Sequence, residues 1–218
     1  MKTFELGTLA TKAEIHAGLV RLQNEITTYL EGLAPDEFLA PQGEAWSPER
    51  HLRHLTKSVG AVAAGMRAPK ILLRLKFGRP RKPSRSFEEV VEMYTAELAS
   101  GARATGRYVP SDRPEEISAE EWCDGVFSRW QRASDALSGA IGRWSEAALE
   151  RYQVPHPLLG AMTVREILFF TLYHNAHHAR RIAERRALRK SASGVIRWKP
   201  GRALGTRRSL PSPGRRPG

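Results

Sequence analysis

Two histidines near the end of the chain, His174 and His178, have the spacing of a metal-binding pair on a helix. Residues four apart lie one turn apart on the same side of an α-helix. Both fall on the apolar stripe of the segment from Thr163 to about Leu188, so they face the interior. Such a pair can hold one divalent ion, or it can be two core histidines hydrogen-bonded to their neighbours. A metal site also needs a third ligand from elsewhere in the chain.

Helix 47–65 offers two candidates for that third ligand, His51 and His54. His51 lies within an apolar stripe of this helix, whereas His54 lies at the edge of the combined apolar face. Periodicity therefore favours His51 and leaves His54 open. A further histidine, His177, points to the flank of the last helix.

Capping residues mark where the helices begin. A Ser or Thr followed three residues later by Glu satisfies free amides at a helix N-terminus, and Ser before Pro is a related start. No alternating β-branched run is bounded by turn residues, so the sequence predicts an all-α fold. The predicted helices begin at Thr11, Ser47, Ser86, Ser118 and Thr163, and cover about residues 11–33, 47–65, 86–107, 118–144 and 163–188.

More than fifty residues separate helix 47–65 from the helix that begins at Ser118. A connection of this length suits a crossover between two parallel helices of a four-helix bundle. We assign residues 1–190 to this one domain, with 66–117 as a crossover insertion. Residues 191–218 are rich in Gly, Pro, Ser and Arg, and we expect them to form a disordered basic tail.

The net charge of +12 is concentrated in two segments. Residues 66–85 hold eight Lys or Arg and no acid, and residues 189–218 hold nine and no acid. Without a base-reading motif, these segments predict loose polyanion binding and no specific nucleic-acid partner. A membrane-surface helix is an alternative for the crossover, but we favour packing of its leucines on the bundle. The apolar residues concerned are Ile71, Leu72, Leu73, Leu75 and Phe77.

The rest of the composition indicates in which compartment the protein is found. No apolar run approaches the length of a membrane span, and no apolar stretch of a signal peptide follows the single lysine near the N-terminus. Cys123 is the only cysteine, so an internal disulfide is impossible. We therefore expect a cytoplasmic protein without a transmembrane segment.

Two segments of the chain resemble the signature of the DinB-like family. In WSPERHLRHLTKS, a Trp-Ser pair opens the helix and a His-Leu follows eight residues after the Trp, which by resemblance makes His54 the first metal ligand. HPLLGAMTVREILFFTLYHNAHHARRI is similar to the family's C-terminal pattern, which makes His174 and His178 the other two. The resemblance implies a four-helix bundle in up-down-down-up order, in agreement with the long crossover.

The resemblance also implies a metal-dependent activity, because family members transfer or isomerise substrates with low-molecular-weight thiols. Two positions depart from the family pattern: Thr56-Lys57 stands where an acid is common, and Arg181 where Gln is common. We expect one divalent ion, with zinc favoured and nickel, iron or manganese open. His51, His177 and Arg181 are candidates to support the ligands or to bind the substrate.

The leading hypothesis is therefore a metal-dependent small-molecule enzyme, either a thiol S-transferase or a hydrolase. Two alternatives stay open: a non-catalytic metal-binding bundle used for sensing or as a scaffold, and a binder of polyanions or membrane surfaces through the basic segments. A homodimer is also expected, with apolar contact supplied by exposed Trp144 or Phe169.

Overall fold

The computed structural model describes residues 2–7 and 9–195, and within these ranges the chain is mainly helical. Eight α-helices, one short 3₁₀ helix and a two-stranded antiparallel sheet make up the described part. Their order is α1 (Lys12–Glu31), α2 (Pro35–Leu39), α3 (Pro48–Arg67), α4 (Lys70–Phe77), α5 (Phe87–Ala99), η1 (Gly106–Tyr108), α6 (Ala119–Gly142), α7 (Glu146–Arg151), β1 (Gln153–His156), β2 (Gly160–Thr163) and α8 (Val164–Val195).

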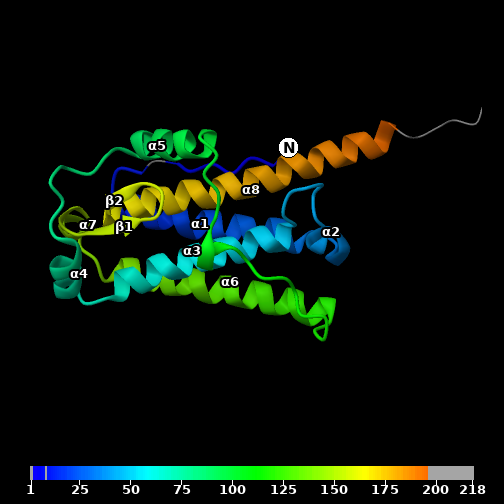
Figure 1. Ribbon diagram of the computed structural model, residues 1–218, viewed down its shortest axis with the longest axis horizontal. Coiled ribbons are helices and arrows are strands. Elements are labelled where there is room, and N and C mark those ends of the chain that lie inside the picture. Colours follow the sequence, from blue (N-terminus) through cyan, green and yellow to red (C-terminus); the bar gives the residue numbers. More distant parts are fainter. Residues whose placement is uncertain (1, 8, 196–218) are drawn as a thin grey trace, which may run out of the picture.

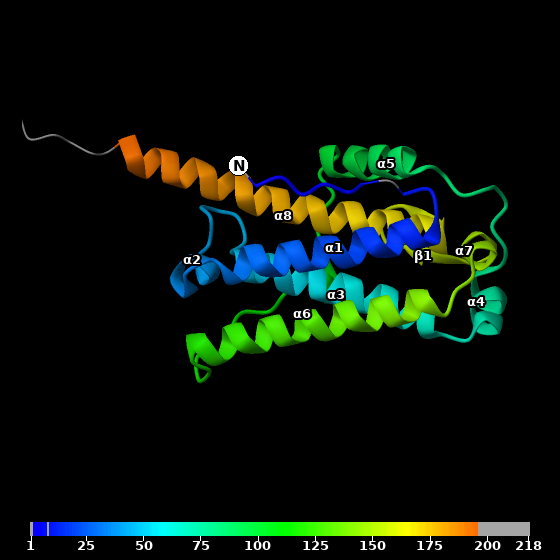
Figure 2. The ribbon, with the colours of Figure 1, turned by 180° about the vertical axis from the view of Figure 1, so that it is seen from behind.

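The four long helices α1, α3, α6 and α8 lie side by side (Figures 1 and 2). Each turns its apolar stripe toward the others, and burial of these stripes accounts for most of the core. The pattern bears out the all-α prediction from helical periodicity. Fully buried side chains include Ile15 and Leu22 of α1, Leu52 and Leu55 of α3, Val126 and Trp130 of α6, and Leu168 and Leu172 of α8.

All five predicted helix starts are confirmed. Thr11 and Ser86 each form a reciprocal capping box with the glutamate three residues on, and Ser47 and Ser118 each accept a backbone amide. At the start of α8 the Thr163 amide donates to Glu166 at 2.9 Å, and the Glu166 amide donates to the Thr163 hydroxyl at 3.2 Å. These hydrogen bonds satisfy amides that the first turn of a helix leaves free.

Two predicted helix ends were wrong. The helix that begins after Ser86 ends at Ala99 rather than near residue 107, because the chain turns at Gly101 with a φ of +95°. The last helix continues to Val195, past the predicted end near Leu188 and into the first five residues of the predicted tail. The rest of that tail, residues 196–218, lies outside the described residues.

The structure also contains a β-hairpin where no strand was expected. β1 and β2 pair from Gln153–Thr163 to His156–Gly160, directly before α8. Two strands of four residues, the first of which contains Pro155, carry too little alternation to be recognised. The turn is closed by His156, whose Nδ1 accepts the amides of Leu158 and Leu159 at 3.2 Å each.

The crossover between α3 and α6 is largely structured. α5 packs on α8 through aromatic contacts, with the ring centroids of Tyr94 and Phe170 5.1 Å apart. Only part of α4 packs as predicted, since Leu73 is buried while Ile71, Leu72 and Leu75 are exposed.

The surfaces proposed for a homodimer were assigned wrongly. Trp144 is 2% exposed and Phe169 is 5% exposed, so neither can offer apolar area to a partner. Trp144 donates its indole N–H to the backbone oxygen of Met66 at 2.9 Å, and Phe169 packs edge-on against Phe87. Both side chains belong to the core, and the homodimer itself stays a prediction.

Within residues 2–7 and 9–195, every helix is either too short or too polar to cross a bilayer.

Candidate metal centre

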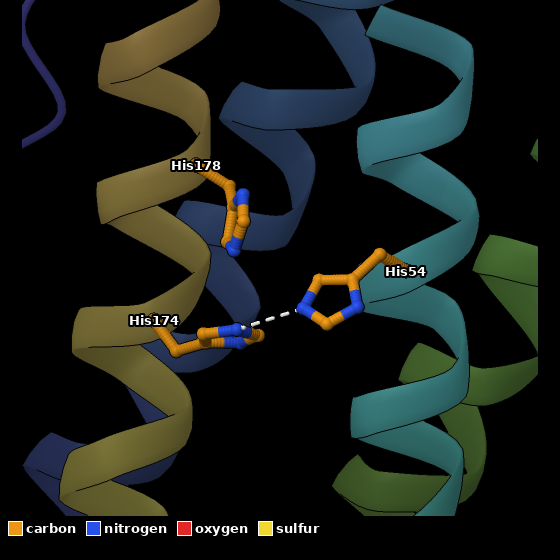
Figure 3. Close-up of side chains that lie close together, drawn as sticks. All are labelled: His54, His174 and His178. Atoms are coloured by element: carbon orange, nitrogen blue, oxygen red, sulfur yellow. Dashed lines mark hydrogen bonds between the residues drawn. The ribbon is translucent and has the colours of Figure 1, made fainter. Parts of the chain in front are cut away.

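Three histidines from two helices converge in the middle of the molecule. His54 comes from the first half of α3, and His174 and His178 come from the middle of α8. One nitrogen of each imidazole lies within 4.8 Å of one nitrogen of each of the other two. Figure 3 shows the rings pointing toward one another across the space between the helices.

Within this cluster, the Nε2 atoms of His54 and His174 lie 3.1 Å apart. Two nitrogens bound to one tetrahedral zinc at about 2.0–2.1 Å lie about 3.3 Å from each other. The observed separation therefore suits two ligands of one ion. The third nitrogen, on His178, lies within 4.8 Å of both.

The tautomer of His54 is fixed from outside the cluster. Its Nδ1 lies 2.9 Å from the carbonyl oxygen of Tyr108, so Nδ1 carries the proton and donates it. The Nε2 atom is then left with a free lone pair that faces His174. Metal-ligating histidines are usually oriented by such a bond from the second ring nitrogen, so His54 is arranged as a ligand would be.

Burial keeps the three imidazoles neutral. Desolvation lowers the pKa of His54, and it lowers the pKa values of His174 and His178 well below the usual value. His54 and His174 are buried, and His178 is the member of the cluster that keeps partial contact with solvent. Neutral imidazole is the form that binds a metal, so the cluster is a competent donor set near neutral pH.

Comparison with known protein families agrees with this geometry. A sequence model of the DinB superfamily matches residues 18–182, a span that contains all three histidines. The chain belongs to the DinB superfamily. A search of curated proteins finds no relative that matches this member. The family assignment made from the sequence is therefore confirmed.

The remaining histidine of α3 touches the cluster from one side. In this DinB superfamily member His51 is 7% exposed, and its Nδ1 lies 2.8 Å from Nδ1 of His178. Burial, and then the charge of Arg185, lower the pKa of His51 to about 3. His51 is thus a neutral neighbour of the cluster. Its burial on the inner side of α3 explains why periodicity alone favoured it.

His177 and Arg181 lie at the edge of the cluster. The ring of His177 lies 5.4 Å from that of His178 and packs near Tyr94 and Tyr173, and burial lowers its pKa. Arg181 is exposed, but its charge contributes to lowering the pKa values of His51 and His177. Both candidates therefore lie near the cluster.

The two residues that replace the acid of the family pattern are both bonded to backbone carbonyls. Thr56 donates its hydroxyl to the Leu52 carbonyl at 2.8 Å, and the Lys57 ammonium donates to the Val109 carbonyl at 2.9 Å. The lysine helps to hold the segment that carries Tyr108, and its charge contributes to lowering the pKa of His54.

Three aromatic residues around the cluster were missed from the sequence. The Trp46 ring lies 5.6 Å from His51 and 5.5 Å from His54, the Tyr94 ring lies 5.9 Å from His174, and Tyr108 supplies its carbonyl. Trp46 opens the first motif, which was a usable signal. Tyr94 and Tyr108 come from the crossover, whose path could not be deduced from spacing.

Proposed function

We propose that His54, His174 and His178 bind one divalent metal ion, with zinc favoured, and leave at least one coordination position for a small-molecule substrate. The single observation that carries this proposal is the 3.1 Å approach of two buried Nε2 atoms, one of them oriented by the Tyr108 carbonyl. Two neutral nitrogens whose lone pairs face each other are not stabilised at this distance unless an ion or a proton lies between them.

The arrangement of the long helices supports this proposal. In Figures 1 and 2, α1 and α8 run in one direction along the molecule, and α3 and α6 run in the other. We infer that these helices form the up-down-down-up bundle that the family resemblance implies. In such a bundle, ligands project inward from facing helices, as the histidines of α3 and α8 do.

The proposed reaction class is thiol S-transfer or hydrolysis of a small molecule. When bound, a divalent ion on three neutral imidazoles supplies a Lewis acid that lowers the pKa of a thiol or a water molecule. The residues of the chain would supply the surroundings of the ion: His54 and His174 are buried, and His178 is partly exposed to solvent. His177, next to His178, and the exposed Arg181 are available to orient an anionic part of a substrate.

Metal analysis of the full chain, purified without a histidine tag, tests the binding part of the proposal. We expect about one divalent ion per chain for a three-ligand site, removable by a chelator and restored by zinc. A chain that takes up no zinc, nickel, iron or manganese at neutral pH would refute the site.

Turnover separates the enzyme from its alternative. The metal-loaded chain is incubated with a low-molecular-weight thiol and an alkylating electrophile, or with an ester, and the products are measured by mass spectrometry. Metal-dependent product that disappears on chelation supports an enzyme. Bound metal without turnover supports the alternative, a non-catalytic bundle for sensing or scaffolding.

A further inference from the structure

The short helix α4 is fixed to one end of the molecule by its inner side. Leu73 is 5% exposed, and the Lys70 ammonium lies 4.7 Å above the Trp144 ring. The end of the helix is held by Gln153 of β1, whose side-chain amide donates to the Phe77 carbonyl at 2.6 Å. α4 therefore has a defined orientation at the end of the molecule where α3 finishes (Figures 1 and 2).

The outer side of α4 is apolar and uncovered. Ile71 is 64% exposed, Leu72 is 54% exposed and Leu75 is 75% exposed. At 100° per residue these three side chains lie within an arc of about 100°, opposite Leu73. Elsewhere among the described residues, the exposed large hydrophobic residues are Val20, at 37%, and Leu188, at 70%. The helix thus has two apolar sides, of which one faces the core and the other faces solvent.

Cations flank this outer side. On the helix, Lys76 lies about 40° beyond Leu72, and Arg74 lies about 60° from Ile71 on the opposite flank. Residues 66–85 contain no acid, and the exposed cations of this segment are Arg67, Lys76, Arg79, Arg81 and Lys82.

The two acids of α7 are already paired with a cation outside α4. Glu146 and Glu150 of α7, at the same end of the molecule, both pair with Arg165 at the start of α8. The outer side of α4 is therefore an apolar strip with a cationic border.

We propose that Ile71, Leu72 and Leu75 dock α4 on an anionic phospholipid surface, with the surrounding Lys and Arg facing the lipid head groups. Amphipathic helices with basic borders bind in this way, with their apolar side in the boundary between head groups and acyl chains. A second copy of the chain is a poorer occupant, because the same side of two copies would bring like charges together. A protein helix is usually received in a groove, whereas α4 projects from the end of the molecule.

Docking in this manner leaves the candidate metal centre accessible. His54 lies thirteen residues before the end of α3, which corresponds to about 20 Å along the helix. The membrane surface would thus contact one end of the molecule and not the cluster of histidines. The proposal is independent of whether the centre holds a metal.

Vesicle flotation with the full chain tests the proposal. One set of vesicles contains only phosphatidylcholine, and the other contains about 30% phosphatidylglycerol as the anionic lipid. The test variant is Ile71→Ser/Leu75→Ser, which keeps the charge. The matched control is Val20→Ser/Leu188→Ser, which removes two exposed hydrophobic residues elsewhere. Thermal unfolding of each variant checks that the core, which these side chains do not join, is unchanged.

We expect the wild type and the control to float with the anionic vesicles and to remain behind with neutral ones. The α4 variant should need at least about tenfold more lipid for half-maximal binding, because binding strength scales with buried apolar area. Equal binding of the α4 variant and the wild type would mean that charge alone attracts the chain, and would overturn the proposal. Absence of binding to anionic vesicles, or equal binding to neutral ones, would overturn it as well.

Discussion

Nδ1 of His51 lies 2.8 Å from Nδ1 of His178, and this contact joins the start of α3 to the middle of α8. Only one of the two nitrogens can carry the proton that they share. If His178 offers Nε2 to a metal, its Nδ1 carries the proton and donates to His51. His51 can accept because burial lowers its pKa to about 3 and keeps it neutral. Through this contact, His51 orients the ring of His178.

The first prediction concerns this contact. His51→Ala should lower zinc affinity by about tenfold and leave the saturating stoichiometry unchanged, because an imidazole that orients a ligand tunes the site without binding the ion. Competition titration with a chromophoric chelator measures the affinity. His177→Ala is the matched control, since its ring also neighbours His178, and it should change the affinity less. An affinity loss for His177→Ala that exceeds that for His51→Ala would contradict the assigned role.

The second prediction concerns acid sensitivity and the hairpin before α8. Burial lowers the pKa of His156 from 6.5 to about 4, and its Nδ1 accepts two backbone amides, which requires the neutral ring. Between pH 6.5 and 4 the unfolded chain therefore binds more protons than the folded chain. Stability contributed by His156 is present above pH 6.5 and is lost as the pH falls, by up to about 1.4 kcal/mol per pH unit.

Urea unfolding in the presence of a chelator, at pH values from about 7.5 to 4.5, measures this dependence. His156→Asn offers an oxygen that can accept the same amides and does not titrate, so its stability should fall less steeply in that window. Identical slopes for the wild type and the variant would show that His156 does not contribute to acid sensitivity.

The third prediction concerns the start of α8. Glu166 is 3% exposed and accepts three hydrogen bonds from Arg85, at 2.7 Å from its backbone amide and at 2.9 and 2.8 Å from its guanidinium. Removing one partner of a buried, hydrogen-bonded ion pair costs about 3 kcal/mol. Glu166→Ala should therefore lower the free energy of unfolding by about that amount, as measured by urea denaturation.

Glu88→Ala is the control for this experiment, because Glu88 is exposed in the first turn of α5. Its effect should stay within about 0.5 kcal/mol. The metal content of Glu166→Ala should be unchanged, because this glutamate caps the helix rather than facing the histidines. A stable Glu166→Ala variant would argue against the anchoring of the crossover at this point.

The sequence was most informative where a local rule decides the structure. Capping bonds depend only on residues three apart, so all five helix starts were predictable. The pair His174 and His178 followed from helical periodicity for the same reason. The hairpin of β1 and β2 and the exposed side of α4 depend on contacts with distant segments, and local spacing does not contain that information.

The choice between His51 and His54 shows the limit of periodicity. Both are buried on α3, at 7% and 5% exposure, and both contact a histidine of α8. A helical wheel favours His51, because the carbonyl of Tyr108 that orients His54 reaches it from the crossover and is not visible in the periodicity. The family motif favoured His54, and in the structure Nε2 of His54 lies 3.1 Å from Nε2 of His174.

Metal content of five alanine variants tests the central claim most directly. Each full chain, without a histidine tag, is loaded with excess zinc, passed through a desalting column and measured for zinc per chain. We predict near-complete loss for the variants of His54, His174 and His178, because two imidazoles chelate far more weakly than three. The variants of His51 and His177 should retain close to one ion. Loss in His51→Ala with retention in His54→Ala, or no loss in any of the five, would contradict the account.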